Sequence, residues 1–176
     1  MSFQRTSITL ALALLAGAAQ AGIVTFSGDS TGGPTFNRLL EDAATLSSEG
    51  TAVAYTAYQF SVDTSGLYTF LTTAAFDNMA FLYAGSFDAA LPAAGALIGN
   101  DDLVSASTSG FAFNLNAGGS YVYVTTGFSN ADFGQFSTTI GGPGVIAAVP
   151  EPSTYALLAM GLAAVGVAAR RRSRKD

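Results

Sequence analysis

The sequence predicts an all-β protein, an antiparallel β-sandwich of jelly-roll type, between an N-terminal signal peptide and a C-terminal hydrophobic sorting helix. Three observations point to the sandwich. Short stretches of alternating apolar and polar residues recur through residues 22–148, Gly-rich turns separate them, and no long amphipathic helical pattern interrupts them. Because each such strand has one apolar face, two sheets packed face to face bury all of them.

The strands are expected in the following order. Residues 23–27 form the first, and residues 58–63 and 67–72 flank a turn at 64–66. Tyr58, Phe60 and Val62 share one face, and we expect the two strands around this turn to pair as a hairpin. Met79, Phe81 and Tyr83 mark another strand. Further strands are predicted at residues 96–99, 111–115, 121–125 and 135–140.

Residues 35–46 carry a different pattern. The apolar residues are spaced as on a short helix and are Phe36, Leu39, Leu40, Ala43 and Ala44. Arg38 precedes Asp42 by one helical turn, which would allow a surface ion pair of modest energy. A solvated loop with scattered charges explains the segment equally well, so both readings stay open.

The aromatic residues of the strands are expected to form the core, because alternation is what a half-buried strand requires. This set comprises Tyr58, Tyr68, Phe70, Phe81, Phe113 and Tyr123. The alternative is a platform on which sugar rings stack. Tyr55, Tyr83 and Phe128 lie near loops, where they would form its rim.

The N-terminus has the pattern of a secretory signal peptide over residues 1–21. Arg5 precedes an apolar run at residues 8–18, and Ala19 and Ala21 form a small-residue cleavage site. Cleavage after Ala21 leaves Gly22 as the first residue of the secreted body, which we place at residues 22–148. An uncleaved membrane anchor is the alternative, and the short apolar run argues against it.

The C-terminal segment, residues 149–176, has three ordered parts. The first is the triplet Pro150, Glu151 and Pro152, whose prolines favour an extended, protease-accessible spacer. The second is an apolar run at residues 155–169 that includes Tyr155, Leu157, Leu158, Leu162, Val165 and Val167. The third is a basic stop made of Arg170, Arg171, Arg172, Arg174 and Lys175.

The apolar run is short for a permanent anchor. As a helix it would span roughly 22 Å, against a hydrocarbon core about 30 Å thick. The basic stop is expected to stay in the cytoplasm by the positive-inside rule, which puts the body on the far side of the membrane. We therefore expect transient anchoring in the inner membrane.

In the order and length of these parts, the C-terminal segment resembles the PEP-CTERM sorting signal of Gram-negative bacteria. The resemblance implies recognition by an exosortase, cleavage near the triplet, and release or transfer to the cell surface. It also implies a setting of exopolysaccharide and biofilm. An ordinary C-terminal anchor with an incidental proline pair is the alternative.

The composition of the body excludes several classes of function. Residues 22–149 hold ten acidic residues and Arg38 as their one base, a net charge of −9, whereas the whole chain has −5. Such a body cannot neutralise phosphates, so nucleic-acid binding is excluded. The chain has no Cys and no His. Because zinc sites and nucleophilic triads normally need one of them, we expect no enzyme and no catalytic residue.

Residues 60–144 also resemble the bacterial pre-peptidase C-terminal type of β-sandwich. The resemblance rests on the segments FSVDTSGLYTF at 60–70, AFDNMAFLYAGSFD at 75–88, GNDD at 99–102, LNAGGSYVYVTTG at 115–127 and GQFSTTIGGPG at 134–144. It implies a jelly-roll-like accessory domain used for adhesion or attachment, without catalysis. Residues 22–53 are less clearly covered.

A candidate metal site lies at the predicted strand ends. Its residues are Asp77, Asn100, Asp101 and Asp102, with Asn78 beside them. Carboxylate and amide oxygens are the ligands of Ca²⁺, although the spacing is not that of an EF-hand. Two alternatives remain open, namely side chains that only cap loop backbone and, more remotely, a carboxylate pair of a glycosidase.

These observations predict an exported, non-catalytic protein of the cell surface or extracellular matrix. Its partners would be the exosortase and an extracellular polysaccharide or matrix protein, and its cofactor, if any, would be Ca²⁺. A small acidic hydrolase that uses carboxylates alone is the alternative.

Overall fold

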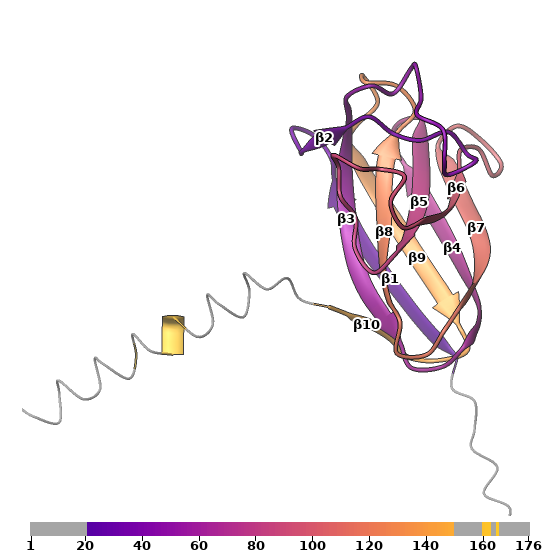
Figure 1. The fold of residues 1–176 in the computed structure, drawn as a ribbon, viewed down its shortest axis with the longest axis vertical. Coiled ribbons are helices and arrows are strands. Elements are labelled where there is room, and N and C mark those ends of the chain that lie inside the picture. The colour runs from indigo at the N-terminus through magenta and orange to yellow at the C-terminus, as the bar shows by residue number, and fades with distance from the viewer. Residues whose placement is uncertain (1–20, 150–159, 163–164, 166–176) are drawn as a thin grey trace, which may run out of the picture.

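A computed structural model of the chain describes residues 21–149, 160–162 and 165. Residues 22–148 form two antiparallel β-sheets that pack face to face (Figure 1). The predicted fold class is therefore confirmed. All strand pairings among the described residues are antiparallel.

The first sheet has four strands, in the order β1 (Gly22–Asp29), β9 (Gln135–Gly142), β4 (Gly66–Ala74) and β7 (Thr108–Leu115). The second has six, in the order β10 (Ile146–Ala148), β3 (Val53–Val62), β8 (Ser120–Gly127), β5 (Asn78–Ala84) and β6 (Ala96–Asn100), with β2 (Thr35–Phe36) also paired to β3. Of these strands, β2 and β10 were not predicted.

The predicted hairpin at residues 58–72 is wrong, because β3 and β4 belong to different sheets. The turn between them crosses the sandwich. Phe60 of β3 and Phe70 of β4 then face each other across the core, with ring centroids 6.0 Å apart. Alternation correctly placed both rings in the core, but it does not say which strand is the hydrogen-bonded neighbour.

Of the two readings left open for residues 35–46, the structure contradicts the helix and shows an irregular segment. After β2 the chain forms a turn that is closed by a bridge between Leu39 and Leu46. The Asp42 carboxylate accepts hydrogen bonds from the backbone N–H groups of Ala44 and Thr45, both at 2.9 Å. Such local side-chain bonds compete with helix formation. Ala43 adopts φ 54°, which a helix does not allow.

The core between the sheets contains most of the predicted aromatic residues. Its buried members are Phe60, Val62, Tyr68, Phe70, Ala80, Leu82, Leu115, Tyr121, Tyr123 and Ile140. Tyr58 and Phe113 pack against it and are partly buried. The Tyr123 hydroxyl lies 2.8 Å from the Thr72 hydroxyl, which lies 2.8 Å from that of Thr138. These bonds satisfy the polar groups that the core encloses.

A second apolar cluster covers the outer face of the six-stranded sheet. It consists of Phe36, Leu39, Val53, Met79, Phe81, Tyr83, Val122 and Val124. Residues of the irregular segment around β2 pack onto β5 and β8 there, with Phe87 from the loop after β5. Strand β5 is consequently buried on both of its faces.

Much of the predicted terminal organisation lies outside the described residues. This holds for most of the signal peptide, including Ala19, for the triplet, for Tyr155, Leu157, Leu158 and Val167, and for the basic stop. Met160, Gly161, Leu162 and Val165 are helical and exposed. Within the part of the chain that the structure describes, no helix is both long enough and apolar enough to cross a membrane.

Candidate cation site and an edge groove

Strand pairing brings the predicted acidic residues together. Asp77 directly precedes β5, and Asp101 and Asp102 directly follow β6. Since β5 and β6 are antiparallel, with Ala80 opposite Asn100, the start of one strand lies beside the end of the other. One carboxylate oxygen from each aspartate lies within 4.8 Å of one from each of the others. We call these three residues the acidic cluster.

The acidic cluster is electrostatically unfavourable in the absence of a cation. Burial, followed by the charges of Asp102, Asp77 and Glu41, raises the pKa of Asp101 to about 6. Burial also raises the pKa of Asp77 above its ordinary value, with Asp132 and Asp102 adding to the effect. Among the described residues, the enclosed Oδ1 of Asp101 has no hydrogen-bond partner.

The amide residues of the predicted site have other partners. Asn100 Oδ1 accepts a hydrogen bond from the backbone N–H of Gly110 at 2.8 Å. Asn78 Nδ2 donates to the hydroxyl of Ser109 at 2.7 Å. Both bonds join the six-stranded sheet to β7. The structure therefore gathers the three carboxylates, while Asn100 and Asn78 hold the two sheets together next to them.

Arg38 lies close to the acidic cluster and is only 1% exposed. Its Nε donates to the carbonyl of Phe128 at 2.7 Å and its Nη1 to that of Leu39 at 2.9 Å. The guanidinium carbon lies 4.6 Å from the centroid of the Phe128 ring. Arg38 opposes the rise in the pKa of Asp101. A surface pair with Asp42, as considered from the sequence, is therefore wrong.

Sequence reasoning missed the burial of Arg38, although one signal was present. Arg38 is the single basic residue among residues 22–149, and Phe36, Leu39 and Leu40 lie close to it in the sequence. In the structure its guanidinium donates to the backbone carbonyls of Phe128 and Leu39. Both carbonyls lie outside the named strands, and Arg38 supplies their donors.

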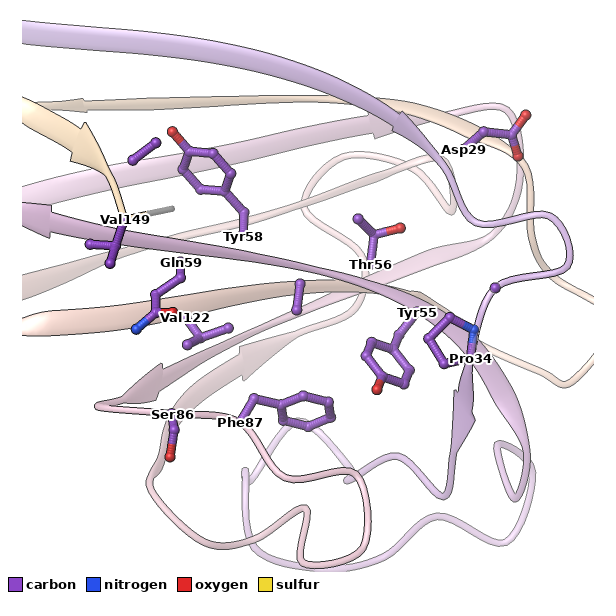
Figure 2. Close-up of a pocket in the computed structure, with 13 residues that line it drawn as sticks. Asp29, Pro34, Tyr55, Thr56, Tyr58, Gln59, Ser86, Phe87, Val122 and Val149 are labelled. Atoms are coloured by element: carbon purple, nitrogen blue, oxygen red, sulfur yellow. The ribbon is translucent and has the colours of Figure 1, made fainter. Parts of the chain in front are cut away.

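A groove of about 640 Å³ follows the edge of β3 and ends near Pro34 and Val149 (Figure 2). Tyr55 and Phe87 meet edge to face in it, with centroids 5.0 Å apart. Tyr58 lies along the same edge, and its ring stacks on that of Phe26 with the ring centroids 3.9 Å apart. We call this feature the edge groove.

The three aromatic residues considered for a rim have different positions. Tyr55 lines the edge groove. Phe128 covers the guanidinium of Arg38. Tyr83 is completely buried in the outer cluster, so it cannot contact a ligand. A continuous aromatic platform is therefore not present among the described residues.

Comparison with known proteins identifies the C-terminal segment. The PEP-CTERM protein-sorting motif matches residues 148–172 of the chain. The chain thus carries this sorting motif, which implies export, an anchored C-terminus and processing by an exosortase. No curated protein matches the chain.

Three solved structures are similar to the body at low sequence identity. The pre-peptidase C-terminal domain of a collagenase from Bacillus anthracis is 14% identical, with TM-score 0.42 over 68% of this chain and 89% of that one. The Yersinia pseudotuberculosis-derived mitogen is 11% identical, with TM-score 0.42 over 76% and 93%. CBM35 from Cellvibrio japonicus Abf62 is 12% identical, with TM-score 0.39 over 72% and 99%. The first is a domain of the type that residues 60–144 resemble.

Proposed function

We propose that the protein is a non-catalytic component of the cell surface or exopolysaccharide matrix, and that its acidic cluster binds Ca²⁺. One observation carries the calcium proposal. The carboxylates of Asp77, Asp101 and Asp102 converge within 4.8 Å, and the pKa of Asp101 is raised to about 6. A divalent cation would offset both causes of the raised pKa, the burial of Asp101 and the repulsion from Asp102, Asp77 and Glu41.

Bound Ca²⁺ would also explain how such an acidic body meets matrix polymers. A body with net charge −9 is repelled by anionic polysaccharide. Ca²⁺ accepts six to eight oxygen ligands, and if each aspartate supplies one oxygen, sugar carboxylates or hydroxyls can complete its shell. The acidic cluster would therefore serve as a bridge between protein and polymer.

Thermal melts of residues 22–149 test the calcium site. We compare EDTA, millimolar Ca²⁺ and NaCl at matched ionic strength. A site specific to the native state should add about 2.7 kcal/mol of stability at about a hundredfold excess over Kd, which is several degrees in Tm. Asp101→Asn should lose this gain. The exposed Asp88 provides a control, because Asp88→Asn removes the same charge elsewhere.

Two results would contradict the calcium site. One is equal stabilisation by NaCl and Ca²⁺, which indicates general screening. The other is an unchanged Ca²⁺ response in Asp101→Asn. The matrix role is tested separately by co-sedimentation of the body with an acidic polysaccharide in Ca²⁺ and in EDTA. Release of new reducing ends in the same mixture would support the hydrolase alternative instead.

We also propose how the two ends of the chain are processed. The mature protein should begin at Gly22 and lack the basic stop, and Pro150→Ala with Pro152→Ala should leave it in the membrane. Mass spectrometry of the protein from cells with and without the exosortase measures both ends. Surface protein that still ends at Asp176 would contradict the scheme.

A further inference from the structure

The outer cluster covers only part of β3. Alternate side chains of this strand lie on the outer face of the six-stranded sheet, namely those of Val53, Tyr55, Ala57 and Gln59. Val53 is completely buried in the outer cluster, whereas Tyr55 and Gln59 are partly exposed and Ala57 is exposed. The edge groove therefore begins where the outer cluster ends.

Two aromatic rings line this part of the edge groove. Phe36, Tyr55 and Phe87 pack edge to face on one another, with ring centroids 5.0 to 5.2 Å apart. Phe36 is buried, whereas Tyr55 and Phe87 are partly exposed and line the groove. Because a buried neighbour holds both rings, they are ordered before a ligand arrives, which lowers the entropy lost on binding.

Polar side chains lie beside the two rings. Figure 2 shows Gln59 and Ser86 on the same side of β3 as Tyr55 and Phe87. Nε2 of Gln59 donates to the hydroxyl of Ser120 at 3.1 Å, which holds the amide in place. An amide oxygen accepts hydrogen bonds, and a hydroxyl both donates and accepts. Gln59 and the exposed Ser86 can therefore bond to a polar ligand that contacts the rings.

Ala57 leaves space in the floor of the groove. It lies between Tyr55 and Gln59 on the outer face of β3, and its side chain is a single methyl group. Val122 of β8 is opposite Gln59 and adds an apolar surface beside it. The groove of about 640 Å³ falls within the range of about 300–1,000 Å³ that is usual for small-ligand sites.

The lining of the edge groove favours a neutral ligand. Among the described residues that line it, Asp29 at the end of β1 carries the one charge. No arginine or lysine belongs to this lining, so it has no cation to bind a carboxylate, sulfate or phosphate. The body as a whole, with its net charge of −9, repels anions as well.

A neutral sugar matches both kinds of surface in the groove. The C–H groups of a sugar ring can pack on aromatic rings, and its hydroxyl groups can bond to amides and to other hydroxyls. An apolar peptide segment would contact the rings equally well. It would, however, cover Gln59 and Ser86 without bonding to them, and burying unbonded polar groups is unfavourable.

We propose that the edge groove binds a segment of a neutral polysaccharide. Tyr55 and Phe87 pack on its sugar rings, and Gln59 and Ser86 bond to its hydroxyl groups. The proposal rests on the matrix role proposed above, but it does not involve the acidic cluster. The acidic cluster would bind acidic polymers through Ca²⁺, whereas the edge groove binds neutral chains directly.

Calorimetric titration of the full chain with neutral oligosaccharides tests the proposal. The protein is kept in micelles of a detergent that carries no sugar, and the probes are β-linked hexasaccharides of glucose, mannose, galactose and xylose. At least one of them should bind with a Kd in the millimolar range or below, and with the same Kd in EDTA and in Ca²⁺. Failure of all four to bind at millimolar concentration would overturn the proposal.

Two alanine substitutions show where the sugar binds. Ala57→Leu fills the space between Tyr55 and Gln59 and should weaken binding about tenfold or more. Ala112→Leu is the matched control, because Ala112 is an exposed residue of β7 in the other sheet, and the Kd should stay unchanged. Thermal melts confirm that both variants are folded. Equal binding by the parent and by folded Ala57→Leu would contradict the assignment to the edge groove.

A third variant tests the hydrogen bond to the ligand. Gln59→Met keeps the length of the side chain but removes its amide, so binding should weaken by about three- to tenfold. An unchanged Kd in this variant would mean that the rings alone hold the ligand, which contradicts the proposed contact.

Co-sedimentation with acidic polysaccharide in Ca²⁺ measures the matrix role independently. If that binding persists while no neutral hexasaccharide binds, the proposal for the edge groove fails alone. If a neutral hexasaccharide binds and the acidic polymer does not, the calcium bridge fails and the edge groove stands.

Discussion

The two faces of the six-stranded sheet are buried by different kinds of structure. The inner face packs against the four-stranded sheet through side chains that alternate along regular strands. The outer face is covered by the irregular segment around β2 and by the loop after β5. The inner face encloses hydroxyl groups bonded to one another, whereas the outer cluster lies beside a buried arginine.

The comparison shows that one strand can belong to two cores of different origin. In β5, Ala80 and Leu82 face the inner core, and Met79, Phe81 and Tyr83 face the outer cluster. The strands that surround the inner core are held in place by backbone pairing along most of their length. The outer cluster depends on a segment that has few backbone bonds to the sheet. The inner core should therefore be the less tolerant of substitution.

The largest expected effect comes from removing one large side chain from each core. Phe60→Ala should lower the free energy of unfolding by about 4 kcal/mol, because opposed sheets cannot close on the cavity. Leu39→Ala should cost about 2 kcal/mol, because the segment around it can shift to fill the cavity. Urea denaturation measures both. Equal losses would mean that the outer cluster is as rigid as the inner core.

Arg38→Met should cost about 3 kcal/mol, since it leaves the carbonyls of Phe128 and Leu39 without their charged donor. Met keeps most of the apolar contact, so the loss reports mainly on the hydrogen bonds and the charge. Arg38→Lys should recover part of the stability through a single donor. Denaturation midpoints compare the three proteins. A Met variant as stable as the parent would show that the guanidinium contributes only packing.

Removing the hydroxyl of one tyrosine from each core should give smaller changes in stability, and the two changes should differ. Tyr123→Phe breaks the buried bond to Thr72 and should cost about 1 kcal/mol. Tyr83→Phe should be neutral or slightly stabilising, because the enclosed Tyr83 hydroxyl has no partner among the described residues. Calorimetry of the two variants gives the difference. A loss in Tyr83→Phe similar to that in Tyr123→Phe would reveal a bonded water at the outer cluster.

The smallest expected effect is a pH dependence from the acidic cluster. Burial raises the folded pKa of Asp101 to about 6, above its ordinary value of 3.8. Its charged form is therefore disfavoured in the folded protein, and this cost decreases as the pH falls from the folded pKa towards 3.8. Without Ca²⁺, Asp101 should make the protein more stable at about pH 5 than at about pH 7. Asp101→Asn should lack this contribution, as Tm measurements against pH would show.

Sequence periodicity predicted the inner core well, because alternation is a local property of each strand. It placed Phe60 and Phe70 in the core without identifying their neighbouring strands. The segment at residues 35–46 has apolar spacing that fits a helix, but the Asp42 carboxylate and the burial of Leu39 against the sheet outweigh that tendency. Contacts of this kind join segments that are distant in the sequence, so they do not produce a periodic pattern of apolar residues.

For the candidate site, sequence analysis selected the three carboxylates that the structure brings together, but it missed their surroundings. Asp77, Asp101 and Asp102 stand at strand ends, which turn signals reveal. The burial of Arg38 depends on the path of an irregular segment, and the edge groove depends on which segments flank β3. Neither is encoded by residue spacing, so both required the structure.

Strand β1 has a further consequence for how the chain folds. Among the described strands it pairs with β9, and the bonded hydroxyls of Thr25 and Thr139 are 114 residues apart in the sequence. Such distant pairing gives a high contact order and slow folding. Strand β1 therefore cannot complete this pairing until residues 135–142 are available, and until then its edge remains open to other unfolded chains.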